Sequence, residues 1–108
     1  MERYCEQEKN CLRVYVPREL DHHEADRLKQ EADFFIETGQ VKTLVFDFAG
    51  TEFMDSSGIG VIIGRSRKMG YFGGEVYAEH LSGRILKIFL YIYFIISVFL
   101  VLNDSILS

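Results

Sequence analysis

Apolar and polar residues near the N-terminus follow the pattern of two short strands. Segments 3–8 and 12–16 are separated by Lys9 and Asn10, a pair that favours a hairpin turn. In the second segment the apolar side chains stand at every other position, which is the period of a half-buried strand. Pro17 comes next, and it ends the strand because proline has no amide hydrogen to donate.

The next stretch has the three- and four-residue spacing of an amphipathic helix. Asp21 is expected to cap its N-terminus, with Glu24 three residues later as in a capping box, and Gly39 is expected to end it. The apolar positions are Ala25, Leu28, Ala32, Phe35 and Ile36.

The rest of the pattern predicts strands alternating with helices. A near-continuous apolar run over 43–48 is typical of a strand buried on both faces. A second helix is predicted after residue 55 and ends at Gly70, a strand over 75–78, and a third helix from 81 onward. In the second helix we expect the sheet-facing positions to be Ile59, Ile62, Ile63 and Ser66. The positions expected to face water are Arg65, Arg67 and Lys68. This order predicts an α/β layer with some parallel strand pairs.

Charge is distributed unevenly along the chain. The 108 residues carry 12 Lys and Arg against 16 Asp and Glu, and a net charge of −4 argues against a nucleic-acid partner. Residues 85–108 contain only two charged side chains, Lys87 and Asp104.

Two cysteines are too few for a disulfide framework, and no histidine stands at zinc-ligand spacing from them. With a polar N-terminus and no signal peptide, we expect a cytoplasmic protein.

The motif Asp55-Ser56-Ser57-Gly58 stands where a strand has ended and a helix begins. The first amides of a helix lack intrahelical partners, so an anion attached to Ser57 would meet free N–H groups and a favourable dipole. Ser and Asp are also the residues that simply cap helices, and on spacing alone the capping interpretation is the more frequent one. Both interpretations stay open at this point.

Other candidate chemistry fails on spacing. The serines lack the glycine that a hydrolase elbow needs two positions earlier, and the glycines after them do not form a dinucleotide or phosphate loop. His22 and His23 are expected to point apart, with nothing nearby to complete a metal site. Asp47 ends an apolar strand, where a carboxylate bound to loop amides is commoner than a catalytic group. We therefore expect no enzymatic activity, no catalytic residue, no metal and no cofactor.

A resemblance decides what spacing leaves open. Residues 53–65, Phe-Met-Asp-Ser-Ser-Gly-Ile-Gly-Val-Ile-Ile-Gly-Arg, resemble the signature of the anti-sigma factor antagonists, the stand-alone STAS domains. Segments 39–48 and 73–76 resemble strands of that family. Segment 19–23 is similar to the branch directed at the anti-sigma-F factor of endospore-forming bacteria. The match covers residues 3–89, so residues 1–89 are expected to form a STAS domain: a mixed β-sheet with helices packed mainly on one side.

The resemblance also implies a mechanism of partner switching in the control of sporulation. The unphosphorylated antagonist binds an anti-sigma factor, which is also a serine kinase, and so frees a sigma factor. The kinase then phosphorylates the second serine of the motif, here Ser57, and the complex separates until a PP2C-type phosphatase removes the phosphate. Asp55 is expected to orient the Ser57 hydroxyl or a loop amide. The other residues expected in this switch are Asp21, His22, Ser56 and Gly58.

The C-terminal segment departs from the family, which usually continues with a final strand and an acidic helix. Residues 90–108 are hydrophobic and atypical. A membrane helix over 85–102 would make the protein a membrane-associated STAS module, which is the alternative function. A second interpretation extends the third helix and adds a last strand that completes the domain. A third is a shifted coding frame near residue 89. We favour partial burial on the sheet.

Overall fold

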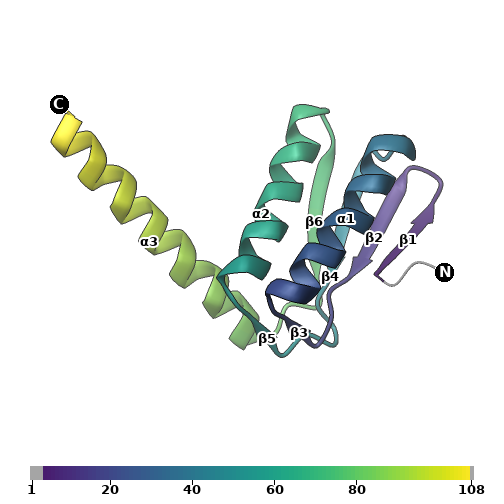
Figure 1. Ribbon diagram of the computed structural model, residues 1–108, viewed down its shortest axis with the longest axis horizontal. Coiled ribbons are helices and arrows are strands. Elements are labelled where there is room, and N and C mark those ends of the chain that lie inside the picture. The colour runs from purple at the N-terminus through teal and green to yellow at the C-terminus, as the bar shows by residue number, and fades with distance from the viewer. Residues whose placement is uncertain (1–3, 108) are drawn as a thin grey trace.

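A mixed β-sheet carries helices on one of its faces (Figure 1). The computed structural model describes residues 4–107, and the side chains of 4–92, 94, 95 and 98. The elements in chain order are β1 (Cys5–Glu8), β2 (Cys11–Tyr15), β3 (Glu19–Leu20), α1 (His22–Thr38), β4 (Thr43–Asp47), β5 (Phe53–Met54), α2 (Ser56–Tyr71), β6 (Glu75–Glu79) and α3 (Gly83–Leu107).

The main sheet has the strand order β1-β2-β4-β6. Strands β1 and β2 form the predicted antiparallel hairpin, and Lys9 takes a positive φ of 56° in its turn. The pairs β2–β4 and β4–β6 are parallel, with Leu44 opposite both Leu12 and Val76. The predicted mixed sheet with helices mainly on one side is therefore confirmed. Arg3, where the first predicted strand begins, lies outside the described residues.

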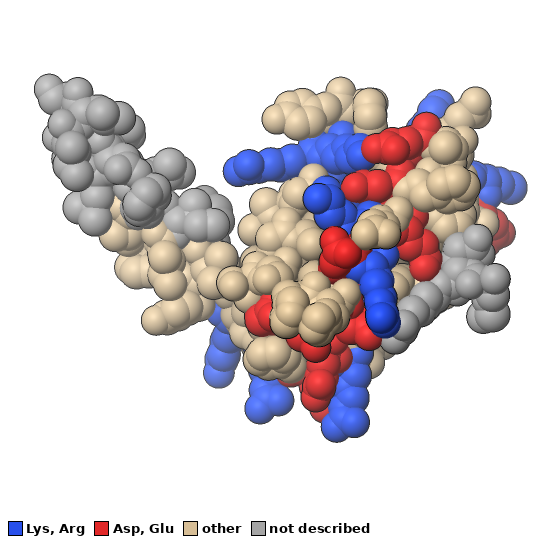
Figure 2. Space-filling view, viewed as in Figure 1, with Lys and Arg blue, Asp and Glu red and all other residues tan. Residues whose placement is uncertain are grey.

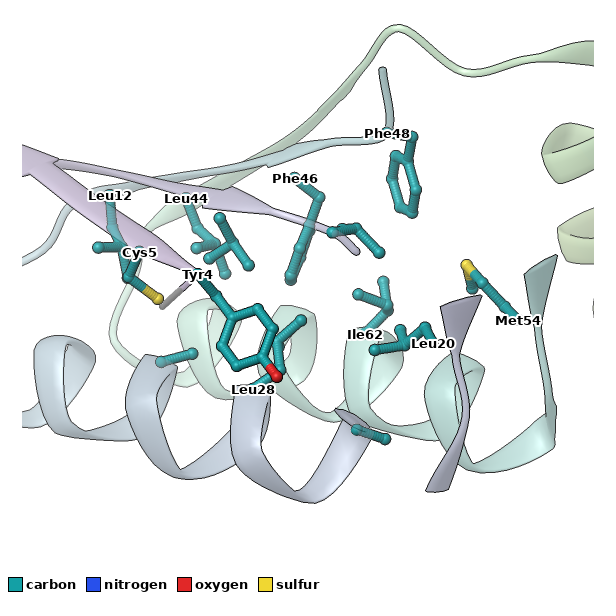
Figure 3. Packing of buried hydrophobic residues seen from close by; sticks show 14 of the residues in the cluster. Tyr4, Cys5, Leu12, Leu20, Leu28, Leu44, Phe46, Phe48, Met54 and Ile62 are labelled. Carbon is teal, nitrogen blue, oxygen red and sulfur yellow. The ribbon is translucent and has the colours of Figure 1, made fainter. Parts of the chain in front are cut away.

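The hydrophobic core lies between the sheet and the helices α1 and α2 (Figure 3). From the sheet, Leu12 and Phe46 point toward the helices, which contribute Leu28 and Ile62. Four of the five predicted apolar positions of α1 are buried, namely Ala25, Leu28, Ala32 and Ile36. Burial of a large apolar side chain contributes about 1.5–3 kcal/mol, so this face holds α1 in place. Asp21 and Gly39 cap α1 as expected.

One position of α2 was predicted wrongly. Arg65 was expected to face water, yet it is 9% exposed. Its Nε atom lies 3.0 Å from Oδ1 of Asp33 on α1, and Nζ of Lys68 lies 3.4 Å from the same oxygen. The ion pair bridges the two helices and offsets the cost of burying the guanidinium. Helix α2 also runs one residue beyond the predicted end at Gly70.

The C-terminal segment is helical throughout its described length. The prediction of a last strand is wrong, because α3 continues from Gly83 to Leu107 and no strand follows β6 within residues 4–107. The aromatic and β-branched content suggested a strand, but a strand beside β6 would need a turn first. Residues 84–102 contain no Gly, Pro, Asn or Asp to make one. The helix instead continues and leaves the body of the protein (Figure 1).

Only the first part of α3 belongs to the core. Ile85 is fully buried, and the ring of Phe89 packs edge-on against Phe48 with centroids 5.7 Å apart. From residue 90 onward, Ile92 is the only described side chain that packs against the core, and the others are exposed. The favoured burial of this segment on the sheet is therefore wrong for most of its described length, because the helix carries it away from the domain. Judged on the residues that the structure describes, no helix is long and apolar enough to cross a membrane. The division of the chain at residue 89 stays a prediction.

Candidate functional site

A second, two-stranded sheet brings the N-termini of α1 and α2 to the same end of the molecule (Figure 1). Strands β3 and β5 are parallel, and Leu20 stands opposite Met54 in their register. Asp21 and Asp55 directly follow these two residues, so the caps of both helices are neighbours. This pairing was not predicted, because strands of two residues are too short to show an alternating pattern.

Each helix is capped by an aspartate in the same way. Oδ1 of Asp21 accepts a hydrogen bond from the Glu24 amide at 2.9 Å, and Oδ1 of Asp55 accepts one from the Gly58 amide at 2.9 Å. The hydrogen bond from the Glu24 amide is the main reason that the pKa of Asp21 lies below its ordinary value. Asp55 thus holds an amide of the helix. The two roles expected for it, which are to orient the Ser57 hydroxyl or a loop amide, stay predictions.

The two serines of the motif are exposed in the first turn of α2. Because Asp55 makes the cap, neither Ser56 nor Ser57 is needed for it, and the Ser57 side chain lies at the surface. The capping interpretation therefore applies to the aspartate and not to Ser57. The dipole of α2 places about half a positive charge at this end, which favours a negatively charged group on Ser57.

Gly58 fixes the distance between the start of α2 and strand β3. A Cβ atom at this position would lie 2.5 Å from the carbonyl oxygen of Leu20 and 2.8 Å from its Cγ. The Asp55 amide also donates to that carbonyl oxygen, at 3.2 Å. The glycine therefore allows close backbone approach to a neighbouring strand, a contact that the sequence alone did not reveal. By contrast, a Cβ atom at Gly60 or Gly64 would meet no atom within 4 Å.

The two histidines at the start of α1 are exposed, as expected of a solvated pair. They do not point apart, however. The ring centroids of His22 and His23 are 4.0 Å apart, with the planes tilted by 37°. His22 follows the Asp21 cap directly, so the structure places it on the same end of the molecule as the serine motif.

Two open hollows flank strand β3. One has a volume of about 890 Å³ and lies between the β5 loop and α3; it is lined by Glu19, Glu52, Phe53, Gly83, Arg84, Lys87 and Ile88. The other, of about 570 Å³, is lined by Tyr4, Tyr15, Val16, Pro17, Arg18, Glu19, Asp21 and Glu24. Nε of Arg18 lies 2.7 Å from a carboxylate oxygen of Glu52 and joins the two loops. The side chain of Phe53 is half exposed beside the first hollow. The sequence did not single it out as a residue of the site.

A separate polar cluster lies on the sheet where β4 and β6 end. Side-chain ligand atoms of Asp47, Glu79 and His80 lie within 4.8 Å of one another. The guanidinium of Arg13 already forms an ion pair with both carboxylates, since its Nη1 lies 3.1 Å from Asp47 and 2.9 Å from Glu79. A metal ion would have to displace this cation, so the arrangement fits an ion-pair network better than a metal centre. Asp47 also accepts from the Ala49 amide at 3.0 Å, as predicted for a strand-end carboxylate.

This cluster makes stability depend on pH. Burial raises the pKa of Asp47, but the Ala49 amide, His80 and Arg13 outweigh it and hold the pKa below the ordinary value. A depressed carboxylate pKa contributes stability above the unfolded value of about 3.9 and loses it as pH falls through the folded value. We expect the free energy of unfolding of Asp47→Asn to fall less steeply than that of the unmutated protein below about pH 4.

Urea unfolding between neutral and acidic pH measures the effect. The control is Asp26→Asn, which removes an exposed carboxylate of α1. Equal acid dependence of the Asp47 variant and the unmutated protein would show that the network does not stabilise the ionised form of Asp47.

Comparisons with known proteins identify the family. The family model described as "STAS domain" matches residues 4–99. The chain is 38% identical over 71 residues to the anti-sigma F factor antagonist of Paenibacillus polymyxa, a match that covers 66% of this chain and 61% of that relative. The chain thus spans less than two thirds of this relative's length.

Two solved structures have a similar fold. The chain is similar to the anti-sigma factor antagonist SpoIIAA in its unphosphorylated form, with a TM-score of 0.71, 28% identity, and coverage of 81% of this chain and 80% of that one. It is equally similar to the phosphorylated form of the Bacillus cell fate determinant SpoIIAA, with a TM-score of 0.71 and 28% identity over 81% of this chain and 79% of that one.

Proposed function

Because the chain belongs to the STAS domain family, we propose that it is an anti-sigma factor antagonist and that Ser57 is its phosphorylation switch. The relative from Paenibacillus polymyxa bears the name of such an antagonist. SpoIIAA, with the same fold, has been solved both with and without phosphate. The protein acts in this proposal as a binding module of the cytoplasm, not as an enzyme, in the control of sporulation.

The observation that carries the proposal is the exposure of Ser57 beside two capped helix N-termini. A kinase needs an acceptor hydroxyl that it can reach, and the aspartate cap leaves this one free of a structural role. Phosphorylation adds about −1.5 to −2 charges. The first turn of α2 tolerates that charge because its amides and dipole favour an anion, so the domain need not unfold to accept the phosphate.

The partner in this proposal is an anti-sigma factor that is also a serine kinase. It would dock on the end of the molecule formed by β3, β5 and the two helix N-termini, over Asp21, His22 and Ser56. Gly58 is buried against Leu20 and would contribute by setting the position of the turn that carries the serines. Phe53 adds an exposed aromatic ring to this surface, a residue type that often anchors protein interfaces. Binding displaces the sigma factor, and a PP2C-type phosphatase restores the unphosphorylated form.

Incubation with the cognate anti-sigma kinase and ATP tests the assignment. We expect mass spectrometry to place one phosphate on Ser57, and the Ser57→Ala variant to bind the kinase but to accept no phosphate. Ser56→Ala is the matched control, because it removes the neighbouring exposed hydroxyl of the same turn and should be phosphorylated normally. Equal phosphorylation of Ser57→Ala and the unmutated protein would place the switch elsewhere.

A further inference from the structure

Helix α3 is apolar on both of its sides. Its core-facing residues are Ile85, Ile88, Phe89 and Ile92. At about 100° per residue these positions span an arc of about 100°. The opposite side carries a second apolar set, which we call the α3 stripe: Leu86, Leu90, Tyr91, Phe94, Ile95 and Val98, each between 41% and 68% exposed.

The α3 stripe is one contiguous surface. Its six positions fall within an arc of about 180°, opposite the side that packs on the domain. Figure 1 shows α3 leaving the body, so neither α1 nor α2 covers this side. A helix that is apolar all round is normally buried all round, and a patch of this kind on a single copy marks an interaction surface.

We propose that the α3 stripe of one copy packs against the α3 stripe of a second copy, in an antiparallel pair of helices. The charge of the molecule supports a second copy as the occupant. The chain carries a net charge of −4, so most surfaces of two copies repel each other. Residues 88–103 contain no Lys, Arg, Asp or Glu, and the face of this part of α3 that Figure 2 shows has no charged side chain among the described residues. The stripe can therefore meet itself without repulsion, as a two-fold symmetric contact requires.

The exposed area is sufficient for a dimer. Six large side chains that are about half exposed offer on the order of 100 Å² each. Two copies together would bury about 1,200 Å², which is the lower end of the range for specific protein–protein interfaces. The stripe contains none of the residues of the serine site, so this contact goes beyond the proposed switch and does not depend on it.

The only two charges of the segment after residue 84 fix the direction of the pair. Lys87 and Asp104 stand at equal distances on either side of the point between residues 95 and 96, about 13 Å from it along the helix. A two-fold axis at that point brings helix position 87 of one copy level with position 104 of the other. An antiparallel pair thus places opposite charges at the same level at both of its ends, whereas a parallel pair places like charges at the same level.

Analytical ultracentrifugation of the full chain over about 1–100 μM tests the proposal, because the dimer fraction of a self-associating protein rises with concentration. We expect a monomer–dimer equilibrium whose dissociation constant rises at least tenfold in Phe94→Glu. Tyr71→Glu is the matched control, since it adds the same charge to an aromatic position of α2 that is 86% exposed; its dissociation constant should change less than twofold. Circular dichroism verifies that both variants fold.

A charge exchange tests the antiparallel register. Lys87→Asp alone should weaken the dimer, and the same change combined with Asp104→Lys should restore it. A monomer at every concentration, or a dimer that Phe94→Glu leaves intact, would overturn the proposal. Sedimentation of the chain with phosphatidylcholine vesicles, without dimer in their absence, would assign the stripe to a membrane instead and would also overturn it. If the double variant Lys87→Asp with Asp104→Lys dimerises no more tightly than Lys87→Asp alone, the antiparallel register is overturned.

Discussion

Replacing Ser57 by Asp should weaken binding of the anti-sigma factor at least tenfold. The substitution puts a permanent negative charge at the surface of the first turn of α2, where the unmodified protein has a neutral hydroxyl. Opposite a carboxylate of the partner about 5 Å away, one unit of charge costs about 3 kcal/mol at an effective dielectric of 20. Even half of that cost is about a tenfold loss of affinity, because each 1.4 kcal/mol is a factor of ten.

The control for this prediction lies one residue away. Ser56→Asp adds the same charge to the same exposed turn and interacts with the same helix dipole. If the partner reads position 57 itself, isothermal titration calorimetry should show a larger loss for Ser57→Asp than for Ser56→Asp. Equal losses would mean that the partner senses the total charge of this end of the molecule and not Ser57 in particular.

The periodic parts of the fold could be predicted from the sequence. The hairpin over β1 and β2 and the helix α1 have regular spacing of apolar residues, and their ends carry strong local signals such as Asp21 and Gly39. Such signals act within a few residues of the chain, so they survive without knowledge of the tertiary structure. The mixed sheet followed from the alternation of strands and helices and from the family resemblance together.

Contacts between distant segments could not be predicted in this way. The burial of Arg65 depends on Asp33, which stands 32 positions earlier on another helix, and a basic residue beside Arg67 and Lys68 has no local signal of burial. The pairing of β3 with β5 likewise exists only because two loops meet. In α3 a local signal was misleading: its β-branched and aromatic residues indicate a strand, but the segment is helical because residues 84–102 contain no Gly, Pro, Asn or Asp to form a turn.

The serine site combines both kinds of information. A cap at the start of α2 follows from the motif and its place at the start of a helix, and the role of Ser57 follows from the family resemblance. That Asp55 makes the cap and that Ser57 is exposed is seen only in the structure. The contact of Gly58 with Leu20 does not follow from the sequence either, because it joins the motif to a strand that precedes α1. This contact sets the position of the first turn of α2, and with it the position of Ser57, relative to the cap of α1. A substitution that disturbs the contact between Gly58 and Leu20 therefore tests whether it sets the position of Ser57.

Replacing Gly58 by Ala should destabilise the protein, while the same change at Gly60 should stabilise it. The new Cβ of Gly58→Ala would lie 2.5 Å from a backbone oxygen of Leu20, which cannot move as a flexible side chain would. Overpacking of this kind costs about 1–3 kcal/mol. At Gly60 a Cβ meets nothing within 4 Å, so the alanine contributes only its higher helix propensity, about 0.5–1 kcal/mol.

Urea unfolding of the two variants tests whether the start of α2 is held against Leu20, because the two glycines lie only two positions apart near the start of the same helix. The midpoint should fall below that of the unmutated protein for Gly58→Ala and rise above it for Gly60→Ala. Gly58→Ala should also bind the anti-sigma factor less tightly at temperatures where it is fully folded, since relief of the clash moves the start of α2 away from β3. Two variants of equal stability would show that the start of α2 is not held against Leu20, and the link between that contact and the position of Ser57 would then fail.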